Sequence, residues 1–333
     1  MLSILIEDRE KYMIYTCGSV GQSDSLKSFV EEGMGIRSEM NRYDIVFMGH
    51  LGTGEIVPFQ GSPFVERGGP AFFGPIAASC LTKKVATVTR IAEKETGLLE
   101  PLKTAGVDLY VQPVETVQYR VVFPTANVDE RQVFRLSGGG HFCIDDVPPI
   151  EPCLIHLGGL SFHEFSLDFM RTLKARGFRL SVDMCSFVNQ VDDQTGLVHL
   201  EDVPEKKDIL RIVDFVKLDV MEAKALTGTD VLKDQADILE DWGSGETIIT
   251  RSDGALARNK GKTVFARFTN RSVKGRMGRG DTVMGSYLAR RLDHSVEDSL
   301  RFAVALTSIK MESAGPFTGS IKDVIERMDE SSP

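Results

Sequence analysis

From Tyr43 onward, short apolar runs alternate along the chain with longer amphipathic stretches. Six runs have the length and β-branched content of strands, at residues 43–49, 85–91, 153–159, 178–184, 213–219 and 246–251. Continuous apolar runs of this kind are typical of strands covered on both faces. Between two of them, Leu167, Met170 and Leu173 recur at helical spacing. Alternating strands and helices predict an α/β fold, with a doubly wound, mostly parallel sheet flanked by helices.

Two segments break this alternation. Residues 117–137 contain two strand-like runs around a polar turn, which predicts a hairpin, and residues 55–69 are similarly extended. Antiparallel strands inserted into a parallel sheet predict a small β lid. Because residues 43–333 contain no internal repeat and no linker-like stretch, we expect one domain that carries this lid.

Residues 1–42 have a different pattern. This stretch is polar, punctuated by glycine and only weakly periodic. We therefore expect an N-terminal extension that is partly disordered, ahead of the main domain.

The charge and cysteine content narrow the classes of function. Lys and Arg number 39 against 48 Asp and Glu, which argues against a general nucleic-acid or anionic-membrane binder. Five scattered cysteines include no C-x-x-C pair, so neither a disulfide framework nor a zinc site is indicated. The first residues include acids where a signal peptide needs an apolar region, and no apolar run approaches about 18 residues, so we expect neither a signal peptide nor a membrane span. We expect a cytoplasmic protein that binds neither nucleic acid nor membrane.

A glycine-rich turn with three bases, "KGRMGRGDTVMGSYL", occupies residues 274–288. In open α/β sheets, ligands bind beyond the carboxyl ends of the strands, where glycine turns let backbone N–H groups approach an anion at a helix start. Asp281 is expected in the first turn of a helix with a buried apolar stripe, at Met284, Tyr287, Leu288 and Leu292. The alternative is that Asp281 only caps this helix.

The stretch "GRGDTVMGSYL" resembles the second signature of the PfkB, or ribokinase-like, carbohydrate kinases, G-A-G-D-[ST]-F-x-x-G. The similarity continues in chain order over about residues 43–320. Four further stretches resemble family motifs, at residues 68–79, 97–109, 213–228 and 248–256. The resemblance implies a ribokinase-like fold and ATP-dependent phosphorylation of an alcohol.

The family mechanism implies roles for the residues of the turn. Asp281 would be the general base that takes the proton of the acceptor hydroxyl. The backbone N–H groups of Gly278, Arg279 and Gly280 would form an anion hole for the transferring phosphoryl group. Phosphoryl transfer depends mainly on alignment and on positive potential around the phosphoryl oxygens, which agrees with this assignment.

The resemblance also implies a site for ATP and Mg²⁺. Glu222 corresponds to the glutamate of the family's N-x-x-E motif, which organises magnesium through water, and Asp219 stands at the asparagine position. Thr250 and Gly254 would border the nucleotide, although their spacing is one residue shorter than the family's. The alternative for Asp219 and Glu222 is that both are helix N-terminal acids favoured by the helix dipole.

On the acceptor side, Gly68 and Gly69 correspond to the family's early GG motif. Phe73 stands where many sugar kinases have asparagine, and the inositol-kinase branch also has phenylalanine there, so a cyclitol acceptor is one expectation. Glu55 would replace the usual aspartate after the first strand. The alternatives are that Glu55 is an exposed loop acid and that Phe73 belongs to the core.

These observations predict an ATP- and Mg²⁺-dependent kinase that phosphorylates a hydroxyl of a sugar or cyclitol. A catalytically silent regulator that binds a nucleotide or sugar on the same fold is the alternative from another class. A nucleoside kinase or a vitamin kinase would share the fold. The exposed edge of the lid predicts a homodimer, because an unpaired strand edge favours a partner strand.

Overall fold

The computed structural model describes residues 12–14, 40–81, 83–126, 130–161 and 164–330. A ten-stranded sheet forms its centre. In spatial order the strands are β1 (Tyr12–Ile14), β6 (Asp108–Pro113), β5 (Val85–Ile91), β2 (Ile45–Gly49), β9 (Leu154–Gly158), β10 (Arg179–Asp183), β13 (Phe215–Asp219), β14 (Glu246–Arg251), β15 (Gly254–Asn259) and β16 (Lys262–Arg267). Neighbouring strands are parallel from β1 to β14, and the β14–β15 and β15–β16 pairs are antiparallel. The predicted mostly parallel sheet is therefore confirmed.

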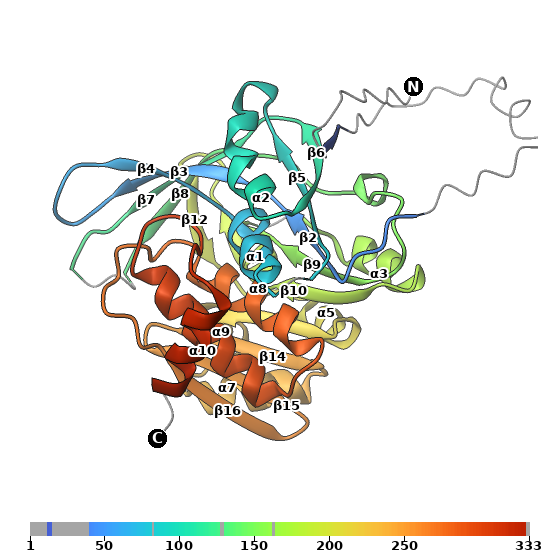
Figure 1. Ribbon diagram of the computed structural model, residues 1–333, viewed down its shortest axis with the longest axis vertical. Helices are drawn as coiled ribbons and strands as arrows, with labels where there is room; N and C mark the ends of the chain where they lie inside the picture. Colours follow the sequence, from blue (N-terminus) through green and yellow to red (C-terminus); the bar gives the residue numbers. More distant parts are fainter. Residues whose placement is uncertain (1–11, 15–39, 82, 127–129, 162–163, 331–333) are drawn as a thin grey trace, which may run out of the picture.

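Helices cover both faces of this sheet (Figure 1). One face packs against α3 (Leu167–Ala175), α5 (Lys206–Ile212), α6 (Val220–Thr227) and α7 (Leu232–Asp241). The other packs against α1 (Pro70–Ser79), α2 (Glu100–Thr104), α8 (Arg279–Arg291) and α9 (Val296–Met311), with α10 (Ile321–Glu330) against α9. Alternate residues of β2 are buried in the cores on the two faces of the sheet. Val46 and Met48 pack on the face covered by α3, α5, α6 and α7, and Ile45 and Phe47 pack on the face covered by α1, α2, α8 and α9. This explains why β2 is apolar on both faces.

A second sheet of six strands lies beside the carboxyl ends of the central strands and projects from the body in Figure 1. Its order is β11 (Asn189–Val191), β12 (Leu197–Leu200), β8 (Gln132–Ser137), β7 (Val117–Val122), β3 (Gly52–Val57) and β4 (Phe64–Gly68). We call it the lid sheet. The structure places residues 55–69 and 117–137 here, together with a third hairpin, 189–200, that the sequence pattern did not indicate.

The N-terminal segment contributes one strand to the central sheet. Tyr12–Ile14 pairs in parallel with β6, Tyr12 opposite Leu109. Most of the predicted extension, residues 1–11 and 15–39, lies outside the described residues. The domain boundary near residue 42 therefore stays a prediction.

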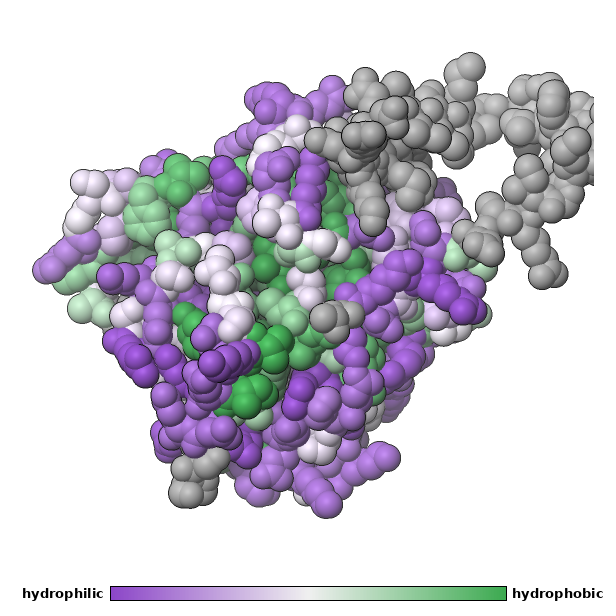
Figure 2. Space-filling model, viewed as in Figure 1, coloured by the Kyte–Doolittle hydropathy of each residue, from purple (hydrophilic) through white to green (hydrophobic). Residues whose placement is uncertain are grey.

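The surface differs between the two sheets. Figure 2 shows apolar surface over the lid, where Phe64 and Val65 of β4 are 48% and 71% exposed. In the same view, hydrophilic residues surround a cluster of apolar residues near the C-terminal helices. Among the described residues, the helices are too short or too polar to span a bilayer.

Candidate active site

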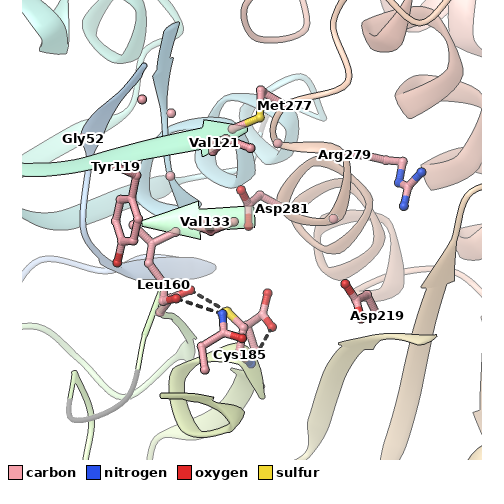
Figure 3. A pocket seen from close by; sticks show the side chains of 18 of the residues that line it. Gly52, Tyr119, Val121, Val133, Leu160, Cys185, Asp219, Met277, Arg279 and Asp281 are labelled. Atoms are coloured by element: carbon pink, nitrogen blue, oxygen red, sulfur yellow. Dashed lines mark hydrogen bonds between the residues drawn. The ribbon is translucent and has the colours of Figure 1, made fainter. Parts of the chain in front are cut away.

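A cavity of about 240 Å³ lies between the lid sheet and the carboxyl ends of the central strands. Each central strand that reaches it contributes a polar or glycine residue at or next to its carboxyl end: Gly159 after β9, Asp183 on β10, Asp219 on β13 and Thr250 on β14. Figure 3 places Asp281 between two groups of side chains, the lid residues Tyr119, Val121 and Val133 on one side and Asp219 and Arg279 on the other. The cavity is thus the topological switch region at which open α/β sheets bind ligands.

The glycine turn forms the start of α8, as the sequence predicts. Gly278 is the N-cap residue, with a left-handed φ of 73° that favours glycine. A Cβ at this position would also lie 2.1 Å from the ring of Phe73, so the turn is tightly packed. The N–H of Arg279 donates to the carbonyl oxygen of Arg276 at 3.2 Å. This N–H, one of the three predicted anion-hole donors, therefore already has a partner in the turn.

Asp281 is the third residue of α8, and its side chain lines the cavity. Burial raises the pKa of its carboxyl group to about 6, Lys217 and Lys310 act to lower it, and Asp183 acts to raise it. The apolar stripe behind it is largely buried, with Met284, Tyr287 and Leu288 in the core. A rigid helix thus presents a carboxylate whose pKa lies close to neutral pH.

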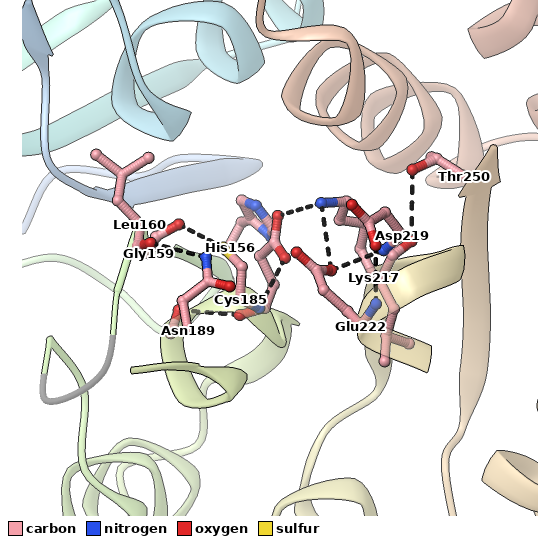
Figure 4. A network of polar contacts seen from close by, with 12 residues as sticks. His156, Gly159, Leu160, Cys185, Asn189, Lys217, Asp219, Glu222 and Thr250 are labelled. Carbon is pink, nitrogen blue, oxygen red and sulfur yellow. Dashed lines mark hydrogen bonds and ion pairs between the residues drawn. The ribbon is translucent and has the colours of Figure 1, made fainter. Parts of the chain in front are cut away.

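Lys217 was not found by sequence reasoning, although a lysine inside the apolar run "FVKLD" was a signal. Its Nζ donates to Asp183 Oδ2 at 2.7 Å and lies 4.0 Å from Glu222 Oε2, with all three side chains buried (Figure 4). A Cβ on Gly280 would lie 3.0 Å from this Nζ. Burial would lower the pKa of Lys217, but Asp183 and Glu222 outweigh it and hold the pKa well above its usual value. A permanent ammonium therefore lies directly beside the glycine turn.

Asp219 and Glu222 form a capping box at the start of α6. Asp219 Oδ1 accepts from the N–H groups of Met221 and Glu222, and Glu222 Oε2 accepts from the N–H of Asp219 at 2.7 Å. Both also line the cavity, so the helix-capping alternative and the site hypothesis are compatible. Arg131 of the lid side lies 3.7 Å from Asp219.

These acids offer oxygen ligands to a cation. One oxygen each of Asp183 and Glu222 and the Cys185 sulfur lie within 4.8 Å of one another. Burial first, and then the nearby carboxylate of Asp219, raise the pKa of Glu222 to about 8. A cation beside Glu222 would relieve this excess of negative charge, and the carboxylate oxygens of Asp219 and Glu222 fit a hard divalent ion such as Mg²⁺, whereas the Cys185 sulfur is a soft ligand that does not.

The remaining predicted site residues divide into two groups. Thr250, Gly68 and Gly69 line the cavity. Glu55, Phe73 and Gly254 do not. Glu55 pairs with Arg120 across the lid sheet at 2.5 Å, Phe73 is buried in the core, and a Cβ on Gly254 would lie 2.2 Å from the Ala266 carbonyl oxygen of β16. These three residues are therefore not brought to the cavity wall, and a role for them in ligand binding stays a prediction.

The lid end of the cavity contains residues that the sequence did not single out. Val121, Val133 and Leu160 provide apolar surface, and Tyr119 and Asn189 provide hydrogen-bonding groups. Tyr119 Oη donates to Ser161 Oγ at 3.4 Å, and Asn189 Nδ2 donates to the Leu160 carbonyl oxygen at 3.0 Å. Their spacing along the chain gave no signal, because they come from three separate strands and a loop.

Comparison with known proteins agrees with this geometry. The model of the pfkB family carbohydrate kinases matches residues 176–323, which confirms the predicted resemblance. No curated protein matches the chain.

Several solved structures of the ribokinase family match almost the whole of their own length. A sulfate complex of a pyrophosphate-dependent kinase in the ribokinase family is 27% identical, with a TM-score of 0.78, over 84% of this chain and 99% of that one. A pyrophosphate-dependent kinase of the same family, complexed with a pyrophosphate analog and myo-inositol, is 27% identical, with a TM-score of 0.77. The match covers 85% of this chain and 99% of that one. The ribokinase of Arabidopsis thaliana, complexed with ribose and ATP, is 16% identical, with a TM-score of 0.68, over 86% and 99%, which shows the shared fold.

Proposed function

This chain is a phosphotransferase with the ribokinase-like fold, and from that premise we propose that it transfers a phosphoryl group from inorganic pyrophosphate to a hydroxyl of a cyclitol. The observation that carries the proposal is the meeting of Asp281, Lys217 and the glycine turn in one cavity. These groups supply a base, a fixed positive charge and backbone donors, which phosphoryl transfer requires at a single point.

In the proposed reaction, Asp281 accepts the proton of the acceptor hydroxyl as its oxygen attacks the terminal phosphorus of the donor. A new O–P bond forms, the bridging P–O bond breaks, and inorganic phosphate leaves. The N–H groups of Gly278 and Gly280 and the ammonium of Lys217 stabilise the charge that develops on the transferring group. Because these dipoles and charges are fixed before the reaction, little reorganisation is needed.

Mg²⁺ is the metal that the predicted site implies, and Asp219 and Glu222 are the residues that would hold it, through water in the case of Glu222. When bound, the ion would supply positive charge to the donor oxygens. The capping box orients both acids by tying their side chains to the backbone of α6. Asp183 is already paired with the Lys217 ammonium, so we do not assign it as a metal ligand.

Pyrophosphate is proposed as the donor on two grounds. First, the neighbours at 27% identity are pyrophosphate-dependent, whereas the ATP-bound ribokinase is only 16% identical. Second, the donor end of the cavity is lined by Arg131, Arg276, Arg279 and Lys217, and none of the described lining residues comes from β15, β16 or α9. A cluster of cations suits a diphosphate, but a purine base also needs an apolar slot. ATP, the donor predicted from the sequence, is therefore the competing donor in the test.

A cyclitol is proposed as the acceptor because a neighbour at 27% identity is complexed with myo-inositol and because the part of the lid end around Tyr119 and Val133 is uncharged, although Glu66 and Arg67 of β4 also line the cavity. The lining of this part, Tyr119, Asn189, Val121, Val133 and Leu160, combines hydroxyl and amide groups with apolar surface. A polyhydroxylated ring presents hydroxyls at its rim and carbon at its faces, so such a lining complements it.

The proposal is tested by measuring phosphoryl transfer for each pairing of two donors, pyrophosphate and ATP, with three acceptors, myo-inositol, ribose and a nucleoside, in the presence of Mg²⁺. We expect the largest kcat/KM for pyrophosphate with myo-inositol. Faster turnover with ATP would replace the donor assignment. Binding of myo-inositol without turnover from either donor would favour the silent regulator instead.

A second copy of the chain is the partner that we propose for the lid sheet. Strand β4 is at its edge, and Phe64 and Val65 of this strand are exposed. An unpaired edge with apolar side chains favours association with another strand. Sedimentation of the wild type should show a dimer that Val65→Asp dissociates, and a wild-type monomer at tens of micromolar would contradict this.

A further inference from the structure

Lys310, near the end of α9, has no role in the reaction described above, yet its ammonium lies behind the glycine turn. Its side chain is one of the largest fully buried ones in the described chain, with 1% of the residue exposed. Nζ donates to the carbonyl oxygens of Gly275 and Met277 and lies 4.6 Å from the centre of the Phe73 ring. Burying a lysine among apolar groups is costly, so this arrangement needs a compensating function or partner.

The carbonyl groups that Lys310 binds belong to peptide units of the turn. The Met277 carbonyl and the Gly278 N–H are two ends of one planar unit, in which they point in opposite directions. A cation on the carbonyl end therefore directs the N–H away from Lys310 and polarises it as a donor. The Gly275 carbonyl and the Arg276 N–H are related in the same way. Gly278 and Arg276 both line the cavity.

A backbone hydrogen bond also holds the turn against the end of α9. The N–H of Gly275 donates to the Met311 carbonyl oxygen at 2.9 Å, and a Cβ on Gly275 would lie 1.7 Å from the Ser313 carbonyl oxygen. The Phe73 ring fills the space between Lys310 and Gly278. Helix α9, through Lys310, thus supports the segment from which the anion hole and Asp281 follow.

The environment keeps the ammonium charged at neutral pH. Burial lowers the pKa of Lys310 to about 8, while Glu66 of β4 and Asp281 of α8 act to raise it. At pH 7, a group with a pKa of about 8 is mostly protonated.

We propose that Lys310 is a positioning residue that acts as a built-in cation: by binding the carbonyl oxygens of Gly275 and Met277, it orients and polarises the turn's N–H groups toward the transferring phosphoryl group. The inference rests on the proposed function for its kinetic consequence. It also predicts anion binding, which is measurable whether or not the correct acceptor is known.

The test compares Lys310→Met, which keeps the length of the side chain but removes its charge, with Lys322→Met on the exposed face of α10. For Lys310→Met we expect kcat to fall on the order of 10²-fold, with the KM for the acceptor within about twofold of wild type. The affinity for methylenediphosphonate, a non-hydrolysable pyrophosphate analog, measured by calorimetry, should fall roughly tenfold. Lys322→Met should leave all three values unchanged.

A second variant separates positioning from simple packing. Lys310→Ala leaves a space behind the turn, and ammonium chloride should restore at least about tenfold of the lost kcat or analog affinity, because a free ammonium ion can bind the same carbonyl oxygens. Tetramethylammonium chloride at equal ionic strength, which is bulky and cannot donate, should restore nothing.

Two results would overturn the inference: wild-type kcat and analog affinity in Lys310→Met, or no recovery with ammonium in a Lys310→Ala protein that melts like a folded protein. If the wild type turns over no pair of donor and acceptor, the proposed function fails by itself. The analog affinities of the variants then still decide the role of Lys310.

Discussion

The two ends of the cavity are built in different ways. At the donor end, charged side chains and glycine N–H groups come from the ends of parallel strands and from the start of α8: Lys217, Asp219, Glu222 and the 278–281 segment. At the lid end, the lining comes from the mixed lid sheet and is largely uncharged around Tyr119, Val121 and Val133, although Glu66 and Arg67 of β4 also line the cavity. The donor end sits on a rigid central sheet, whereas the lid is a separate layer.

This difference separates two properties of the enzyme. The donor end contains the groups that act on the phosphoryl group, so changes there should lower kcat. The lid end contains groups that contact only the acceptor in the proposed reaction, so changes there should alter the KM for the acceptor. Each of the following measurements tests this separation.

The largest effect is expected at Asp281. Asp281→Asn removes the base without changing the size of the side chain, so kcat should fall by roughly 10²-fold or more, while the affinity for methylenediphosphonate stays nearly unchanged. Asp293→Asn, an exposed acid just after the same helix, should have wild-type kcat. Undiminished turnover in Asp281→Asn would remove the general-base assignment.

Lys217→Met should have the next largest effect. It removes the ammonium beside Gly280, so we expect kcat to fall by about 10²-fold and the affinity for methylenediphosphonate to fall as well. Asp183 would lose its partner, and the free energy of unfolding should drop by about 3–5 kcal/mol. Steady-state kinetics, calorimetry and chemical denaturation measure the three quantities.

The matched control for Lys217 is Lys224→Met, an exposed lysine of α6 that pairs with Asp230. It should change none of these quantities appreciably. A Lys217→Met protein that is destabilised but retains its kcat would show that Lys217 serves only the structure.

A smaller effect is expected from pH. Asp281 must be ionised to accept a proton, and its pKa is raised to about 6, so kcat should fall as the pH drops through 6 and be about tenfold lower at pH 5 than at its plateau. Lys217 and Lys310, which face Asp281, both favour the ionised form, and Asp183 opposes it. Lys217→Met should therefore move this limb of the profile to higher pH, and an unmoved limb would argue against the contact.

The smallest effect is expected at the lid. Tyr119→Phe removes one hydroxyl from the acceptor end, and losing a hydrogen bond worth about 1 kcal/mol should raise the acceptor KM roughly fivefold. The kcat and the affinity for methylenediphosphonate should be close to wild type. A fall in kcat with an unchanged acceptor KM would break the separation between the two ends.

The glycine turn shows what could be predicted. Its glycines, the acid that follows and the apolar stripe of α8 are all within 20 residues, so local rules for turns and amphipathic helices were enough to place Asp281 at a helix start. The six central strands were found for the same reason, because each is a continuous apolar run. Strands β15 and β16 were missed, since their outward positions are polar or charged.

The acceptor side shows where such prediction ends. Glu55 and Phe73 were matched by their place in a motif, but the cross-strand pair with Arg120 holds Glu55 in the lid, and the packing of α1 buries Phe73 under the turn. The residues that do line this end come from β7, β8, β11 and the loop after β9. Which of their side chains meet depends on strand order and register, and these are set by long-range pairing.

The sequence by itself determined the alternation of strands and helices, the glycine turn and the acid that opens α8, because these depend on the conformational preferences of neighbouring residues. Only the tertiary structure decided that Lys217, more than 60 residues before Gly280, lies against it, and that Lys310 binds the carbonyl groups behind the turn. Both lysines are buried polar groups whose partners come from other elements, so their roles exist only once the layers of the fold have packed together.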